Sequence, residues 1–329
     1  MKKLLLVFLL ATLNAMAQQP YKTIGTLERL DPALDKIVSP GAKAEIIAEG
    51  FDWSEGPLWV EKHKMLLFSD VPRDTVYKWT EAKGKEVYLT PSGYTSKIPR
   101  GGEIGSNGLL LDNKGRLVLC QCGNKQMAAM DASLDKPSPK YIALAAAYNG
   151  KKFNSPNDAV YNSKGELFFT DPPYGLEGGE KSTKREIPFQ GVYKAAANGR
   201  VTLMTDTLTR PNGIAFFPGE KTVIVANSDP QKPLWYAYDI TPAGTFSNAR
   251  IFASAKGRNG NGLPDGLKID SKGTVFATGP GGLWIMSKEG KLLGRLLVPE
   301  STSNCALSAD EKTLYITNDG QVLRFKMRN

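Results

Sequence analysis

One motif recurs about every fifty residues and constrains the fold more than any other feature of the chain. Each copy begins with a Glu, Asn or Asp, called here the head residue, followed by a usually small residue, an apolar strand, a turn and a second strand. The six heads are Glu55, Asn107, Asn157, Asn212, Asp265 and Asn304. A repeat of this length, rich in short strands and Gly-containing turns, is typical of a β-propeller. We therefore predict an all-β, six-bladed β-propeller whose heads meet at one end of a central channel.

The segments between the strands of each copy support this prediction. DNKG, NSKG, PGEK and DSKG supply the Gly, Asn or Asp that hairpin turns with positive φ require. Successive heads are 52, 50, 55, 53 and 39 residues apart, and the short last interval predicts a minimal loop in the fifth blade. Residues 45–50 (EIIAEG) are expected to pair with the last blade and close the ring. Insertions at 90–106 and 172–190 are expected beside the channel mouth, where binding residues usually lie.

The chain divides into three predicted parts. Residues 1–17 combine a basic start, an apolar run from Leu4 to Leu13 and the small-x-small sequence Ala15-Met16-Ala17, which together indicate a signal peptide. The run is short for a bilayer span, so an uncleaved anchor is the weaker alternative and no stable membrane insertion is expected after cleavage. Residues 18–44 are expected to be an N-terminal lead-in packed against the propeller, which occupies 45–329. Export to a periplasm or to the exterior follows.

The charge pattern and the single histidine argue against some functions. The formal net charge is +9, but the lysines are scattered through turns, and basic blocks interleaved with aromatic residues are missing. We therefore expect no nucleic-acid binding. The single histidine, His63, lies in a predicted turn, which argues against a histidine-based zinc centre or a Ser-His-Asp triad.

Three cysteines belong to the predicted propeller: Cys120, Cys122 and Cys305. Cys120 and Cys122 lie two apart on one predicted strand and face the same side, a poor arrangement for a bond between them. A disulfide from either one to Cys305 stays open in an exported protein. We favour three buried, small apolar residues.

The heads are also hard oxygen donors. Glu55, Asn157, Asn212 and Asp265 supply two carboxylates and two amide carbonyls, a set that suits Ca²⁺ better than zinc or magnesium, although another divalent metal is possible. The alternative is that polar heads only cap strand starts around a watery tunnel. A bound Ca²⁺ with open positions polarises a carbonyl, and a nearby carboxylate activates water. Asp265 and Asp158 are the candidates for that carboxylate.

Several motifs together are similar to those of one family. They are EGPLW at 55–59, FSDVPRDTVYKW at 68–79, SPND at 155–158, FTDPPYGL at 169–176, RPNGIAF at 210–216 and LPDGLKID at 263–270. Over roughly residues 45–327 the chain resembles the SMP-30/gluconolactonase/LRE-like family of six-bladed calcium propellers. The resemblance implies calcium ligands at Glu55, Asn212 and Asp265, with Asn157 as a fourth ligand or a substrate contact. It also implies an acid/base role for Asp265 and hydrolysis of a sugar lactone or a related cyclic ester.

The sequence departs from the family pattern at two positions. Ser155 stands where regucalcin-like members have an Arg, and Cys122 stands where many bacterial relatives have a His. Because of both departures, the resemblance does not specify which substrate this chain binds. The candidate substrate-binding residues are Asn157, Asn107, Asp158, Tyr174 and Arg100, with Arg210 and Asn304 as further candidates for the pocket wall. An ordinary loop role is equally compatible with Arg100, Tyr174 and Arg210, whereas the repeat register places Asn107 and Asn304 on the tunnel wall.

Three functions are compatible with these features. The first is a secreted or periplasmic Ca²⁺-dependent lactonase acting on a small-molecule sugar lactone or related ester. The second is a promiscuous metallo-esterase or phosphotriesterase that uses the same site. The third is a propeller that binds a sugar, a peptide or a partner without catalysis and holds calcium as a structural ion, because a fold alone does not establish an activity.

Overall fold

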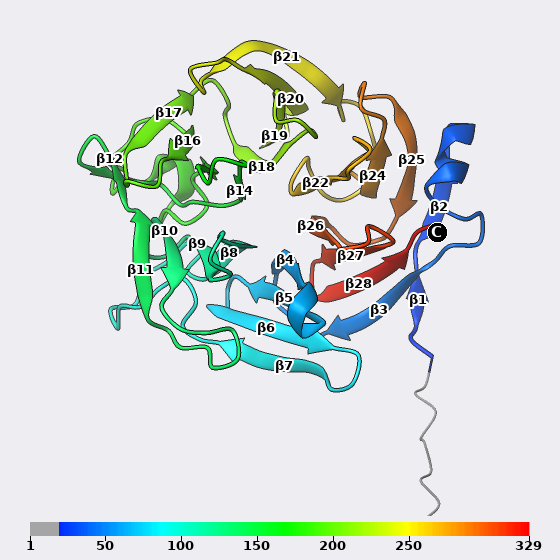
Figure 1. Ribbon diagram of the computed structural model, residues 1–329, viewed down its shortest axis with the longest axis horizontal. Coiled ribbons are helices and arrows are strands. Elements are labelled where there is room, and N and C mark those ends of the chain that lie inside the picture. Colours follow the sequence, from blue (N-terminus) through cyan, green and yellow to red (C-terminus); the bar gives the residue numbers. More distant parts are fainter. Residues whose placement is uncertain (1–19, 329) are drawn as a thin grey trace, which may run out of the picture.

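The computed structural model describes residues 20–328, so the predicted signal peptide lies outside the described residues. Within residues 20–328, six antiparallel sheets of four or five strands are arranged as blades around a central channel (Figure 1). The predicted all-β, six-bladed propeller is therefore confirmed. In the described part of the chain, no helix is both long and apolar enough to cross a membrane.

The first four blades follow the chain in order, and the first strand of each lies nearest the channel (Figure 1). The first blade comprises β4 (Ser54–Val60), β5 (Met65–Asp70), β6 (Thr75–Thr80) and β7 (Gly84–Leu89). The second comprises β8 (Ser106–Leu111), β9 (Leu117–Gln121), β10 (Gln126–Met130) and β11 (Tyr141–Ala145). The third comprises β14 (Ala159–Tyr161), β15 (Leu167–Asp171), β16 (Gly191–Ala195) and β17 (Val201–Thr205). The fourth comprises β18 (Pro211–Phe216), β19 (Thr222–Asp229), β20 (Lys232–Ile240) and β21 (Phe246–Ser254).

The last two blades each gain strands from the N-terminal part of the chain. The fifth comprises β22 (Leu267–Ile269), β23 (Val275–Gly279), β24 (Gly282–Met286) and β25 (Leu292–Leu297), with β2 (Thr26–Arg29) at its edge. The sixth comprises β26 (Thr302–Leu307), β27 (Thr313–Asn318) and β28 (Gln321–Lys326), followed by β3 (Ala44–Glu49) and β1 (Thr23–Ile24). The remaining elements are the ribbon of β12 (Ala147–Tyr148) and β13 (Lys151–Lys152), and three 3₁₀ helices, η1 (Pro32–Lys36), η2 (Glu61–His63) and η3 (Gly179–Lys181).

The ring closes where the two ends of the described chain meet, as residues 45–50 predicted. β3 pairs antiparallel with β28, with Glu45 opposite Arg324. The Arg324 guanidinium donates to the Glu45 carboxylate at 2.6 Å and also bonds Glu81 of the first blade. It lies 5.6 Å from the centre of the Trp79 ring, a cation–π distance. One partly buried cation therefore ties the last blade to the first.

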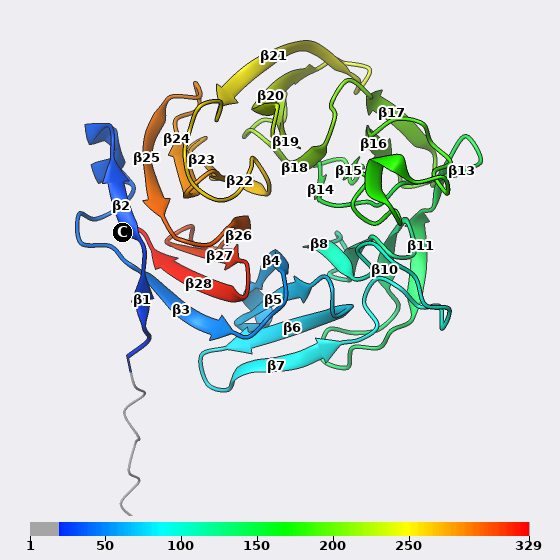
Figure 2. The ribbon, with the colours of Figure 1, turned by 180° about the vertical axis from the view of Figure 1, so that it is seen from behind.

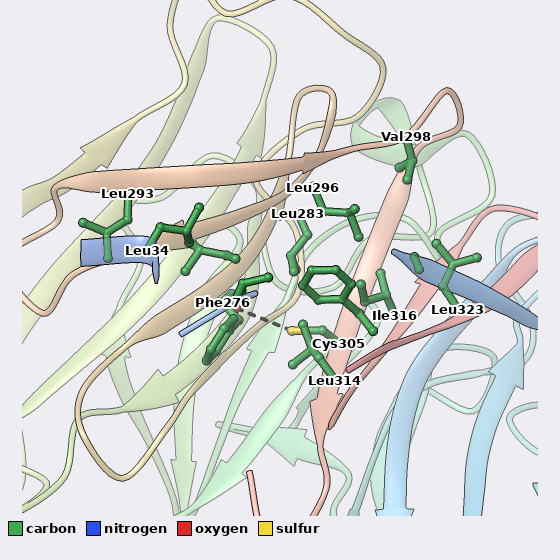
Figure 3. Packing of buried hydrophobic residues seen from close by; sticks show 14 residues of the cluster. Leu34, Phe276, Leu283, Leu293, Leu296, Val298, Cys305, Leu314, Ile316 and Leu323 are labelled. Atoms are coloured by element: carbon green, nitrogen blue, oxygen red, sulfur yellow. Dashed lines mark hydrogen bonds between the residues drawn. The ribbon is translucent and has the colours of Figure 1, made fainter. Parts of the chain in front are cut away.

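The lead-in is more ordered than the sequence predicted, because it contributes an edge strand to the fifth blade. β2 pairs with β25, and Arg295 donates to the Glu28 carboxylate at 2.6 Å. Leu34 of η1 is fully buried among side chains of the fifth and sixth blades, including Phe276 and Leu293 (Figure 3). The strands β1 and β2 of the lead-in are short and show no clear alternation of apolar and polar residues, so the sequence did not predict them.

Apolar side chains fill the space between neighbouring blades and hold the ring together. Buried clusters lie at each of the six blade junctions. Figure 3 shows the cluster between the fifth and sixth blades, where the Cys305 thiol donates to the Phe276 carbonyl oxygen at 3.5 Å. Cys120, Cys122 and Cys305 are all free and buried, which confirms the expectation of small core residues.

The glycine that follows most heads has a packing reason. A Cβ on Gly56, whose φ is +53°, would lie 2.0 Å from the carbonyl oxygen of Asn107, the next head. A Cβ on Gly266 would lie 2.0 Å from Cγ of Asn304, the head of the sixth blade. Real side chains do not approach so closely, so glycine allows the inner strands to come together. The repeat therefore packs the heads into a tight ring.

Candidate metal centre and active site

A cavity of about 370 Å³ opens at the end of the channel where the heads lie. Five of the six heads line it, and the inner strands that carry or directly follow them surround the channel in both views (Figures 1 and 2). The full lining consists of Trp53, Glu55, Glu103, Asn107, Asn157, Tyr174, Asn212, Ser228, Gly262, Leu263, Asp265, Ser301 and Thr302. The predicted convergence of the heads is thus present in the structure.

Four head oxygens in this cavity have no hydrogen-bond partner within the described protein. They are the Oδ1 atoms of Asn107, Asn157, Asn212 and Asp265, and all four are buried. The Asn212 amide group is held by its nitrogen, which donates to Ser228 Oγ at 3.0 Å and leaves the oxygen unpaired. Buried polar atoms in folded proteins nearly always have a partner, because an unpaired one costs about 1–3 kcal/mol. These oxygens therefore form a set of acceptors suited to a ligand that the protein itself does not supply.

Burial and neighbouring negative charges raise the pKa values of the carboxyl groups in the ring. Glu55 is 1% exposed, and its Oε2 accepts from Gly56 N at 2.7 Å and from Asn304 Nδ2 at 3.3 Å. Burial, reinforced by the nearby charges of Asp158 and Glu103, raises the pKa of Glu55 to about 8. Burial and the Glu55 charge also raise the pKa of Asp265 well above its usual value. A cation between Glu55 and Asp265 would favour their ionised forms.

The donor set fits a hard divalent cation. Glu55, Asn157, Asn212 and Asp265 offer two carboxylates and two amide oxygens, the donor types that calcium takes. Among residues 20–328, no group of three or more His, Cys, Asp or Glu side chains is arranged to hold a metal. Any ion bound here would therefore depend on the two amides as well as on the two carboxylates.

Asp158 lies outside the cavity lining. It is 3% exposed, and its Oδ1 accepts from Ala159 N at 2.8 Å. Its Oδ2 lies 3.4 Å from Asn304 Nδ2 and 3.8 Å from Lys268 Nζ. Asn304 thus links Asp158 to Glu55 across the channel, as the tunnel-wall prediction for this head implies. Of the two candidate bases, Asp265 is the one that lines the cavity.

Of the loop residues proposed from the sequence, one lines the cavity and two do not. Tyr174 lines the cavity. Arg100 does not, because its guanidinium donates to the carbonyl oxygens of Gly123, at 2.6 Å, and Gly175, and so joins two loops. Arg210 pairs with Glu180 at 2.7 Å.

Several lining residues were not singled out by sequence reasoning, among them Trp53, Glu103 and Ser228. Glu103 had a usable signal, since it is the only acidic residue of the insertion at 90–106 that was expected beside the channel mouth. Ser228 ends up near Asn212 only through the pairing of β18 with β19, which the sequence does not specify residue by residue.

The family assignment rests on most of the chain. The model of the SMP-30/gluconolactonase/LRE-like region matches residues 53–319, which begin just before the first head and end after the last. The chain belongs to this family. The match spans all six heads and every residue that lines the cavity.

Known relatives agree with this assignment. A gluconolactonase from Zymomonas mobilis is 34% identical over 314 residues, covering 93% of this chain and 87% of the relative. A pentonolactonase from Haloferax volcanii is 24% identical over 272 residues and covers 81% of each chain. The solved structure of a gluconolactonase from Xanthomonas campestris superposes with a TM-score of 0.80 at 27% identity, covering 94% of this chain and 99% of that one.

Proposed function

We propose that this protein is a Ca²⁺-dependent hydrolase that opens sugar lactones. The observation that carries the proposal is the ring of unpaired, buried head oxygens at the bottom of a ligand-sized cavity. Membership of the family and the similarity to the Zymomonas gluconolactonase support the choice of lactones as substrates.

Four heads would hold the ion: Glu55, Asn157, Asn212 and Asp265. When bound, Ca²⁺ supplies Lewis-acid polarisation of the lactone carbonyl. The Asp265 carboxylate accepts the proton of the water that attacks this carbonyl, in the manner of a general base. The ring opens at the acyl carbon–oxygen bond and yields the hydroxy acid.

The rest of the cavity suits a small polar ring. Its volume of about 370 Å³ falls near the lower end of ligand pockets in general. Asn107 of β8 and Tyr174 of the loop after β15 both line it, and their amide and hydroxyl groups can bind sugar hydroxyls. With Ser155 in place of an Arg, hydroxyl recognition in this chain falls to those amide and hydroxyl groups.

The test is hydrolysis of a panel of sugar lactones by the protein beginning at Gln18, followed by pH-stat. We expect turnover that disappears on chelation and returns with added Ca²⁺. Asp265→Asn should lower kcat by about 10²–10⁴, the contribution typical of a general base. Calcium-saturated protein that opens no lactone, or turnover that survives complete chelation, would refute the proposal.

The proposal includes export from the cytoplasm with removal of residues 1–17. The basic start at Met1–Lys3 and the small residues Ala15 and Ala17 support it. Terminal sequencing of the protein recovered from a periplasmic or extracellular fraction should begin at Gln18. An intact Met1 on the recovered protein would contradict export by cleavage.

A further inference from the structure

One carboxylate in the cavity belongs to no head. Glu103 lines the cavity together with Glu55 and Asp265, but it lies on the insertion that precedes β8. Within the described chain its only side-chain hydrogen-bond partner is the Cys122 thiol, 3.9 Å from Oε2. Its carboxyl group is therefore available to a molecule in the cavity.

The backbone around Glu103 is fixed on both sides. Its own amide donates to the Tyr174 carbonyl oxygen at 3.2 Å. Two residues later, Gly105 N donates to the Val71 carbonyl oxygen at 2.9 Å, and Gly105 in turn accepts from Cys122 N at 3.2 Å. Arg100 joins the neighbouring loops through their carbonyl groups. Glu103 is therefore held at the cavity wall by contacts with three blades.

The surroundings of Glu103 favour a carboxyl group that carries a proton. Burial raises its pKa to about 7, and the Cys122 thiol opposes that shift. The other titratable groups that face it are Glu55, Asp265 and Tyr174, and none of them supplies a positive charge. No Lys or Arg of the described residues forms an ion pair with Glu103.

We propose that Glu103 is the general acid that protonates the ring oxygen of the lactone as it leaves; this inference rests on the proposed lactone hydrolysis. The leaving group is an alkoxide, which is strongly basic and departs readily only when it receives a proton. The ion of the proposed function would favour the ionised form of Asp265, whereas Glu103 belongs to no head and is not among the residues that would hold the ion. One carboxylate that accepts a proton and one carboxyl that donates it is a recurrent pattern in hydrolytic sites.

The step balances. The oxygen of water forms the new bond to the acyl carbon, and one of its protons passes to Asp265. The bond between the acyl carbon and the ring oxygen breaks, and its electron pair takes the proton of Glu103. The product is the hydroxy acid, and transfer of the proton from Asp265 to Glu103 through water restores both groups.

The test compares leaving groups in the variant Glu103→Gln. Gln has nearly the same size but has no acidic proton to give. The substrates are gluconolactone and two acetate esters, one of ethanol and one of 4-nitrophenol, whose anion leaves without protonation. We expect kcat to fall by about 100-fold on the lactone and the ethyl ester and to stay within about threefold on the nitrophenyl ester. Calcium affinity by titration calorimetry should not change.

The matched control is Glu186→Gln. Glu186 lies on the other insertion and accepts from Lys152 N at 2.8 Å, away from the cavity lining. Its three rates should equal those of the parent protein. Equal losses on both esters in Glu103→Gln, an unchanged lactone rate, or loss of calcium binding would each overturn the acid role.

The two esters also separate this inference from the proposed function. A parent protein that hydrolyses the esters but opens no lactone refutes the lactonase proposal, while the ester pair still tests Glu103. A parent protein that hydrolyses none of the three substrates overturns both.

Discussion

Replacing Glu55 with Gln should stabilise the calcium-free protein and weaken its response to calcium. The pKa of Glu55 is raised from 4.5 to about 8 by burial. A carboxyl whose folded-state pKa is raised stabilises the fold below its unfolded pKa, and that stability is lost as pH rises through the folded pKa. Between about pH 4.5 and pH 7 the loss amounts to roughly 3 kcal/mol, at about 1.4 kcal/mol for each pKa unit.

Gln removes the charge and keeps an oxygen that can accept from Gly56 N. In chelator at pH 7, Glu55→Gln should therefore be more stable than the parent protein by up to about 3 kcal/mol, or roughly 5 °C in Tm for a chain of this size. Near pH 4.5 the two should unfold together. Saturating Ca²⁺ should raise the Tm of the parent protein much more than that of the variant, because the ion loses a carboxylate ligand.

The assay is thermal unfolding in EDTA and in Ca²⁺ across this pH range. The control is Glu289→Gln, an exposed carboxylate in the turn between β24 and β25 whose side chain is 66% accessible, which should change neither curve. If chelated Glu55→Gln proves less stable than the parent at pH 7, or if the stability gap fails to grow with pH, the electrostatic description of the ring is wrong.

Three further predictions concern the scaffold. The Asp171 carboxylate accepts from the backbone amides of Asn154, at 2.8 Å, and Ser155, at 2.7 Å, one on each oxygen. Asp171→Asn should destabilise the protein by about 1–3 kcal/mol in urea unfolding, because one of these amides would then face an NH₂ group. An unchanged midpoint would contradict this. Leu34→Ala should cost about 2–5 kcal/mol, since this lead-in side chain is fully buried, and a cost below about 1 kcal/mol would mean that the lead-in is dispensable. Thiol titration should detect no reactive cysteine in the native protein and three after denaturation; fewer than three would indicate a disulfide.

The repeat made the fold and most of the candidate metal centre predictable. Because the period places each head at or just before the start of an inner strand, Glu55, Asn157, Asn212 and Asp265 could be assigned to one channel end from the sequence alone. The glycine after most heads had the same cause, since the next blade occupies the space of its side chain. The radial repeat thus predicts which residues that are far apart in sequence lie close together in the fold.

Features outside the repeat were less predictable. Asp158 follows its head directly, and adjacent residues of an extended chain point to opposite sides, so its engagement by Asn304 and Lys268 depended on local backbone geometry. Arg100 has the chemistry of a substrate contact, but its guanidinium donates to the carbonyl oxygens of neighbouring loops instead. Glu103 reaches the cavity through a loop whose path no periodic pattern describes.

The most direct test of the metal-dependent site is the lactone hydrolysis rate measured against free Ca²⁺, beside the calcium occupancy of the same samples. Activity should rise along the binding curve, and Asn212→Ala, which removes one amide ligand, should move both curves to higher Ca²⁺ by the same factor. Full hydrolysis at zero occupancy, or occupancy that rises without hydrolysis, would contradict the central claim that the head ring binds the ion that opens the lactone.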